Sequence, residues 1–146
     1  MNVSKRADYA MRAMAYLASQ PPDTFVLAGT VALNMSVPQV FLSKIMKQMV
    51  EAGLAYSRSG PRGGYALARP PSQINFREVL EAVDGPVQMV PCQTGKGGDC
   101  AIHEHCTQVQ VWDAIRARVA SVLEEYTLDT VQTRGLGSAS EVVIRL

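Results

Sequence analysis

Apolar residues first recur with helical spacing near the beginning of the chain. Within residues 4–19, small and apolar side chains share one face: Ala10, Ala13, Met14 and Leu17. Ser4 is well placed to cap the first turn of a helix. The prolines after Gln20 end the pattern, because a residue that precedes proline avoids the helical region. The pattern therefore predicts a first helix over residues 4–19.

Two further helices are predicted directly afterwards. Residues 27–33 form a short apolar stretch, and Ser36 with Gln39 makes the pattern of a capping box. Apolar side chains then repeat at positions i, i+3, i+4 and i+7: Leu42, Ile45, Met46 and Met49. The opposite face is polar and basic, and Gly53 ends the helix. Two short helices of this kind are typical of a helix-turn-helix.

Two short strands follow, over residues 54–57 and 64–68. The stretch between them is rich in glycine and proline, which favour turns. A hairpin directly after a helix-turn-helix is a wing. The expected fold class is therefore mainly α with a small β-hairpin wing, and residues 1–70 form a winged helix-turn-helix domain that binds DNA.

A long helix is expected over residues 107–126, after a short helix over residues 76–83. Its apolar residues form a stripe with a period near 3.5: Val109, Trp112, Ile115, Val119, Val122 and Tyr126. No other long helix is free to cover this stripe, so we expect a homodimer in which Trp112 and Val119 are buried against the partner. Residues 71–130 would then hold a loop and the dimerisation helix, and residues 131–146 a partly disordered C-terminal tail.

Charge and composition narrow the function. Residues 1–69 hold eight Lys and Arg against three Asp and Glu, whereas the rest of the chain is net acidic. A basic half suggests that this part meets a polyanion. Apolar runs fall short of the roughly 18 residues that span a membrane, and no secretory signal is recognised, so a cytoplasmic protein is expected. No catalytic triad, P-loop or nucleotide motif is present, and we do not expect an enzyme.

The first turns of a recognition helix meet base edges in the major groove. Gln39 can pair with adenine through two hydrogen bonds, and Ser43 can serve several bases. Lys44 and Lys47 are placed to contact phosphates, which add affinity without reading sequence. The two lysines fit an ordinary solvated surface equally well.

Two arginines stand on the predicted wing. Arg58 and Arg62 lie in or next to its glycine-rich turn, where they could enter a minor groove. Arg62 has no obvious local role in so short a turn. The expected partner of this half of the chain is a double-stranded DNA operator.

Three cysteines lie close together in a glycine-containing loop, and they are the three that the chain contains: Cys92, Cys100 and Cys106. Thiolates on such loops hold iron–sulfur clusters. Structural zinc sites usually contain closer pairs of cysteines, but His103 and His105 leave a zinc site with three Cys and one His open. An electron-transfer or disulfide-exchange protein is disfavoured, because the chain lacks a Cys-x-x-Cys motif.

Three stretches and the three cysteines together resemble one bacterial family. The stretches are residues 5–12, 60–65 and 79–85. They resemble the iron–sulfur transcription regulators typified by IscR, NsrR and RirA, over about residues 1–130. The resemblance implies a homodimeric winged-helix regulator, taken here as a repressor, whose 2Fe–2S or 4Fe–4S cluster changes its affinity for DNA. The signal would be iron, redox state or nitric oxide. The gap of seven residues between Cys92 and Cys100 departs from the IscR pattern and looks most like the RirA branch.

The resemblance leaves the fourth cluster ligand open. The IscR type places a histidine three residues after its last cysteine, where this chain has Val109. The NsrR type uses an aspartate on the first helix of the other subunit, and Asp8 stands at the matching place. Asp8 could instead be a surface carboxylate paired with Arg12, and His103 or His105 could supply the ligand. A zinc-stabilised or cluster-free winged-helix repressor that senses cysteine oxidation is the alternative function.

Overall fold

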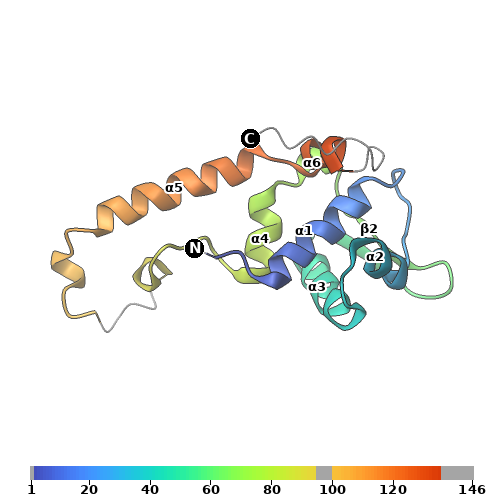
Figure 1. Ribbon diagram of the computed structural model, residues 1–146, viewed down its shortest axis with the longest axis horizontal. Helices are drawn as coiled ribbons and strands as arrows, with labels where there is room; N and C mark the ends of the chain where they lie inside the picture. The colour runs from blue at the N-terminus through green and yellow to red at the C-terminus, as the bar shows by residue number, and fades with distance from the viewer. Residues whose placement is uncertain (1, 95–99, 136–146) are drawn as a thin grey trace.

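The computed structural model describes residues 2–94 and 100–135. The elements follow one another in this order: α1 (Lys5–Ala18), α2 (Ala28–Met35), α3 (Gln39–Glu51), β1 (Ala55–Arg58), β2 (Gly64–Leu67), η1 (Pro71–Gln73), α4 (Phe76–Asp84), η2 (Pro91–Thr94), η3 (His103–His105), α5 (Val109–Glu125) and α6 (Leu128–Gly135). Helices α1 to α4, α6 and the hairpin form one body, and α5 extends away from it with η2 and η3 beside its far half (Figure 1). The predicted fold class, mainly α with a hairpin wing, is confirmed.

Helix α1 lies at the centre of this body. Ser4 caps it by accepting a hydrogen bond at Oγ from the backbone N–H of Ala7, at 3.0 Å. Helices α2, α3, α4 and α6 and strand β2 all pack against α1. The apolar face expected from the sequence, which includes Met14, is the buried one. It meets a core of larger side chains from the other elements: Leu42, Ile45, Met46, Met49, Leu54, Ile74, Val79 and Leu128.

The turn between α2 and α3 differs from the expected capping box. Ser36 is the residue that ends α2, in the left-handed conformation with φ 53° and ψ 43°. Helix α3 starts after Pro38 without a side-chain cap. The capping-box prediction was therefore wrong, because the tight reversal between the two helices needs a left-handed residue where a helix N-cap would be extended. A true capping box lies instead at α4, between Asn75 and Glu78.

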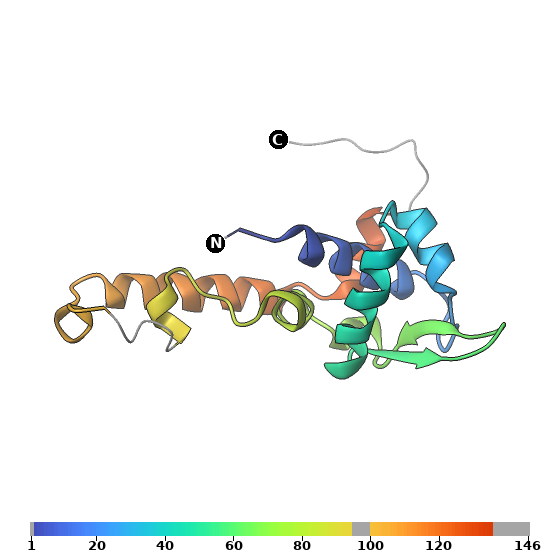
Figure 2. The same ribbon diagram turned by 90° about the horizontal axis from the view of Figure 1, so that it is seen from below.

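The predicted wing is present as an antiparallel pair in which Ala55 faces Leu67 and Arg58 faces Gly64. It projects from the body as a narrow ribbon (Figure 2). A third extended segment lies beside β2, because Val26 and Tyr65 exchange two backbone hydrogen bonds of 2.9 and 2.8 Å. The wing is thereby tied to the segment that leads into α2.

The base of α5 is fixed to α4 by charge. The guanidinium group of Arg77 on α4 bonds to Glu124 on α5 and to Glu81 one turn along α4. These contacts, the one with Glu124 first, raise the pKa of Arg77 above its ordinary value. Apolar packing acts at the same place, since Val119 and Leu123 pack against the buried side chains of Ala7, Leu80 and Val87.

This packing covers part of the expected dimer stripe within the chain itself. Val119 is half-buried by these contacts, and Trp112 is also half-buried. Their burial against a partner subunit stays a prediction. Three other apolar residues of α5 are the exposed ones: Val111 at 58%, Ile115 at 38% and Val122 at 50%. A period near 3.5 identifies an apolar stripe, but it does not tell which edge of that stripe the chain itself covers.

The C-terminal part also differs from expectation. Residues 128–135 form helix α6, which crosses the expected start of a tail at residue 131 and packs on α1. Leu128 is fully buried, and Thr127 pairs with Asn75. Residues 136–146, the remainder of the expected disordered tail, lie outside the described residues. In the described part of the chain, no helix has the length and apolar character needed to cross a membrane.

Gly64 should be intolerant of any side chain. Its φ is +123°, and an added Cβ would lie 2.0 Å from the carbonyl oxygen of Val26. We expect Gly64→Ala to lower the free energy of unfolding by about 3 kcal/mol, through strain and overlap together. Gly60→Ala is the matched control, because Gly60 has φ +95° but open space around it. It should cost about 1 kcal/mol. Urea unfolding measures both, and equal losses would contradict the close approach.

Candidate nucleic-acid interface and cysteine loop

The outward face of α3 carries the reading residues expected from the sequence. Gln39, Ser43, Lys44 and Lys47 are all exposed, because the buried positions of the helix lie on its other side. Ser43 Oγ donates to the carbonyl of Gln39 at 3.2 Å. Lys47 Nζ lies 3.8 Å from the carboxylate of Glu51, in a pair whose side chains are 77% and 63% exposed. Such a pair is weak in water, so Lys47 can exchange it for a phosphate.

Two residues extend this face. Val40, in the first turn of α3, is 70% exposed and offers an apolar surface of the kind that contacts a thymine methyl group. Arg6 at the start of α1 donates to Gln48 Oε1 at 2.7 Å and so places a positive charge beside α3. Sequence reasoning did not select Arg6. The adjacent basic pair Lys5-Arg6 was the signal that could have indicated it.

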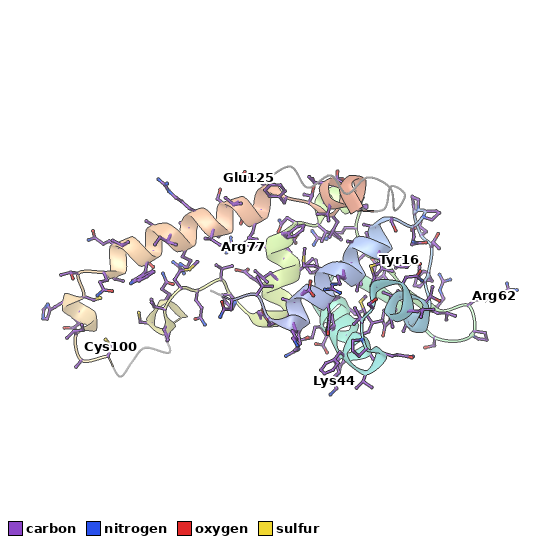
Figure 3. All side chains as sticks on the ribbon, viewed as in Figure 1. Tyr16, Lys44, Arg62, Arg77, Cys100 and Glu125 are labelled. Atoms are coloured by element: carbon purple, nitrogen blue, oxygen red, sulfur yellow. The ribbon has the colours of Figure 1, made fainter. Side chains whose placement is uncertain are left out.

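The two wing arginines have different surroundings in the structure. Arg62 is exposed in the turn and projects at the tip of the hairpin, whereas Lys44 lies on α3 (Figure 3). Arg58, at the end of β1, is also exposed, and its guanidinium carbon lies 3.8 Å from the ring centroid of Phe25. The sequence located both arginines on the wing, but it did not reveal the aromatic contact.

Phe25 is therefore a residue of the candidate interface that sequence reasoning missed. It lies in the segment between α1 and α2 and is half-buried. The run Thr24-Phe25-Val26 consists of residues that favour extended structure, and this was the available signal. Such a run predicts an extended segment, but it does not predict which strand the segment will join.

The side chain of Gln93 attaches the loop that carries the cysteines to α5. Gln93, next to Cys92, accepts hydrogen bonds at Oε1 from the backbone N–H groups of Met89 and Val90, at 2.7 and 3.3 Å. Its Nε2 donates to Asp113 on α5 at 3.1 Å. These bonds fix η2, and with it Cys92, against the long helix.

The three predicted metal ligands are free thiols that the described structure does not bring together. Cys92 and Cys106 are half-buried and Cys100 is exposed. Among the described residues, no group of three or more His, Cys, Asp or Glu side chains is close enough to hold one metal ion. Cys100 lies at the end of the molecule opposite Arg62 (Figure 3).

Asp8, the fourth predicted ligand, forms an ion pair on α1. Its Oδ2 lies 2.7 Å from Arg12 Nη2, and Arg12 Nε donates to its Oδ1 at 3.2 Å. The Asp8 side chain is 47% exposed. The i, i+4 pairing considered from the sequence is thus present. It leaves the carboxylate at the surface, where a second subunit could reach it.

The start of α1 is also bonded to the end of α4. Ser4 donates from Oγ to Asp84 Oδ1 at 2.6 Å and from its backbone N–H to Oδ2 at 3.2 Å. Asp84 is the last residue of α4, and the chain runs from there towards the cysteine loop. The loop and the helix that carries Asp8 therefore share an anchor.

Comparison with known proteins identifies the family to which this chain is similar. Residues 3–134 match the Rrf2 family model, described as "Iron-dependent Transcriptional regulator". Rv1287 of Mycobacterium tuberculosis, whose name describes an HTH-type transcriptional regulator, is 37% identical over 90% of this chain and 81% of its own length. The HTH-type transcriptional regulator NsrR of Halalkalibacterium halodurans is 28% identical, with 91% of each chain covered.

Solved structures agree on the fold. CymR of B. subtilis, described as its global cysteine regulator, superposes with a TM-score of 0.75 at 22% identity, covering 91% of this chain and 97% of CymR. IscR of T. potens gives a TM-score of 0.71 at 22% identity, covering 91% of this chain and 87% of IscR. The resemblance drawn from the sequence is confirmed. Because the family model spans nearly the whole chain, this protein belongs to the Rrf2 family, which consists of transcriptional regulators and not of enzymes.

Proposed function

We propose that this regulator is a repressor whose affinity for a DNA operator is controlled by an iron–sulfur cluster on Cys92, Cys100 and Cys106. The observation that carries the proposal is a set of three free thiols on one loop, in a chain of an iron-dependent regulator family. The operator would be double-stranded DNA, and the protein would bind it in the cytoplasm.

The donor chemistry fits such a cluster. Thiolates are the donors that iron–sulfur clusters use, and three of them leave one iron site for another group. Cys92 sits in the short helix η2 and Cys106 directly follows η3, so two of the donors lie on locally ordered backbone. When bound, the cluster would supply iron–thiolate bonds that are sensitive to iron supply, oxidation and nitric oxide. Gln93 would keep its side of the loop attached to α5 throughout.

The DNA side of the proposal uses two surfaces. Gln39 and Ser43 on α3 would read base edges in a major groove, with Lys44 and Lys47 on phosphates. Arg62 at the tip of the hairpin would contact the neighbouring backbone or minor groove. The exposure of all these side chains supports the proposal, since none would need to leave the core on binding.

Anaerobic purification tests the cluster. The protein should be brown with visible absorption, and replacing Cys92, Cys100 or Cys106 by Ala should abolish the colour, because each thiolate supplies one of few iron bonds. Thr107→Ala, an exposed change directly after Cys106, is the matched control and should stay brown. DNA binding, measured with and without the cluster, should differ for the wild type.

A colourless protein whose DNA binding changes on thiol oxidation would overturn the cluster proposal in favour of the cluster-free repressor. The cluster-free repressor is kept as the second candidate function because solved structures of CymR, a cysteine regulator in one organism, share the fold.

We further propose that Asp8 of the partner subunit supplies the fourth ligand. Asp8→Ala should speed cluster loss on exposure to air at least about tenfold, because a ligand of the cluster is removed. Arg12→Ala is the control, since it breaks the same ion pair and keeps the carboxylate. Visible absorbance over time measures both. Equal acceleration in the two variants would show that the ion pair matters and the ligand assignment is wrong.

The dimer belongs to the same proposal, with its contact moved to the exposed stripe of α5. Val111, Ile115 and Val122 lie on one side of the helix and would pack against a second copy. Val122→Lys should raise the dimer dissociation constant about a hundredfold or more, because it would bury an unpaired charge. Light scattering after size exclusion measures the mass. Gln110→Lys, an exposed change on another side of α5, should leave the dimer intact. A dimer unaffected by Val122→Lys would place the interface elsewhere.

A further inference from the structure

The contact between Arg58 and Phe25 joins two parts of the chain that are distant in sequence. Arg58 ends β1, and Phe25 precedes α2. The guanidinium carbon lies 3.8 Å from the ring centroid, well within the range of a cation–π contact. Arg58 itself is exposed and Phe25 is half-buried, so the ring belongs to the body while the cation faces water.

The register of the wing explains why these side chains meet. Arg58 faces Gly64, and Tyr56 faces Ala66, so all four positions share one face of the hairpin. The pairing of Val26 with Tyr65 places Phe25 on that same face, beyond β2. Between the ring and the cation, β2 therefore presents only a glycine and an alanine, and Arg58 can cross the strand.

Gly64 is needed for this arrangement. Its missing side chain allows the backbone of Val26 to approach β2. An added Cβ would lie 2.0 Å from the Val26 carbonyl oxygen. The glycine thus allows the segment that carries Phe25 to lie beside the wing.

A stacked arginine differs from a salt-bridged one in what it leaves free. The ring covers one flat face of the guanidinium group, whereas the N–H donors lie around its edge. Among the described residues, no carboxylate pairs with Arg58. The donors of Arg58 therefore stay available for an acceptor outside the chain, in an orientation that the ring restricts.

We propose that Phe25 is a positioning residue that holds Arg58 in place to bind a DNA phosphate. The proposal rests on the proposed DNA-binding function and adds a residue that need not touch DNA itself. An unrestrained arginine would lose side-chain freedom when it orders on a phosphate, which weakens binding. Phe25 removes most of that freedom in the free protein.

The test uses a DNA duplex that the full-length wild-type protein selects from random sequence. The protein is used in whichever form binds DNA, with or without the cluster. Phe25→Leu keeps an apolar side chain and removes the ring. It should weaken binding about fivefold, or about 1 kcal/mol at 1.4 kcal/mol per tenfold, and leave the salt slope of log K unchanged. Arg58→Ala should reduce that slope by about 0.9, the value for one phosphate contact. Phe25→Tyr, which retains a ring, should bind as the wild type does.

The double variant decides between positioning and mere structural support. If Phe25 acts through Arg58, Phe25→Leu should have no further effect in the Arg58→Ala background. A fivefold loss that persists there, or no loss with Arg58 present, would overturn the proposal. Melting temperatures of all variants check that the wing remains folded.

Two further measurements separate the possible failures. The Arg58 Nε–Hε resonance should carry a ring-current shift in the free wild type and lose it in Phe25→Leu, with Arg62 as the unaffected control. An unshifted wild-type resonance would overturn the stack itself.

Arg62→Ala reports whether the wing binds DNA at all. If it weakens binding while Phe25→Leu does not, only the positioning role fails. If no duplex is selected, the DNA-reading function fails, and the proposal fails with it.

Discussion

The close packing made possible by the small side chains of α1 determines the positions of the other elements. Ala7, Ala10 and Ala13 have no exposed surface, and Met14 fills the space beside them. Short side chains let the neighbouring helices approach closely, and α2, α3, α4 and α6 all use this face or its flanks. Added methylenes in such a well-packed interior force side chains off their rotamers and shift the backbone, at a cost of about 1–3 kcal/mol. Helix α3, the proposed recognition helix, and helix α4 are therefore held relative to each other through α1.

Polar contacts connect α1 both to the end of α4 and to α3. Near its start, Ser4 is bonded to Asp84, where α4 ends and the chain leaves for the cysteine loop. Two residues on, Arg6 is bonded to Gln48 of α3. Asp8 follows two residues after Arg6 on the same helix. A rigid helix with one bond towards the loop and another towards the reading surface can transmit a small displacement, because packed cores shift between discrete arrangements and do not deform continuously.

Sequence periodicity predicted the helices and the wing well, because each of these elements has one face towards a single core. It failed where the decisive partner was remote in sequence. Ser36 has the composition of a helix N-cap, but the reversal between two packed helices used it to end α2. Helix α6 depends on Thr127 pairing with Asn75 and on Leu128 reaching the core. For the candidate site, the sequence identified which residues carry charge or thiol groups, but the contact that Phe25 makes with the wing follows from strand register alone.

If the cysteines sense a signal as proposed, the shape of the chain limits how that signal can reach DNA. Helix α5 carries Cys100 to the end of the molecule opposite Arg62, so the loop and the wing tip are separated within one subunit (Figure 3). Three polar links connect them among the described residues. Gln93 attaches the loop to α5, Arg77 attaches α5 to α4, and Asp84 attaches α4 to α1. The links of Arg77 with Glu124 and of Ser4 with Asp84 are exposed, and such contacts are weak on their own, whereas the Gln93–Asp113 hydrogen bond is half-buried. The apolar contacts of Val119 with the body must therefore carry most of the mechanical coupling at the base of α5. A partner subunit that placed its own α1 against the loop would shorten this route to a single helix, which would give the proposed homodimer a role beyond doubling the number of α3 helices that meet DNA.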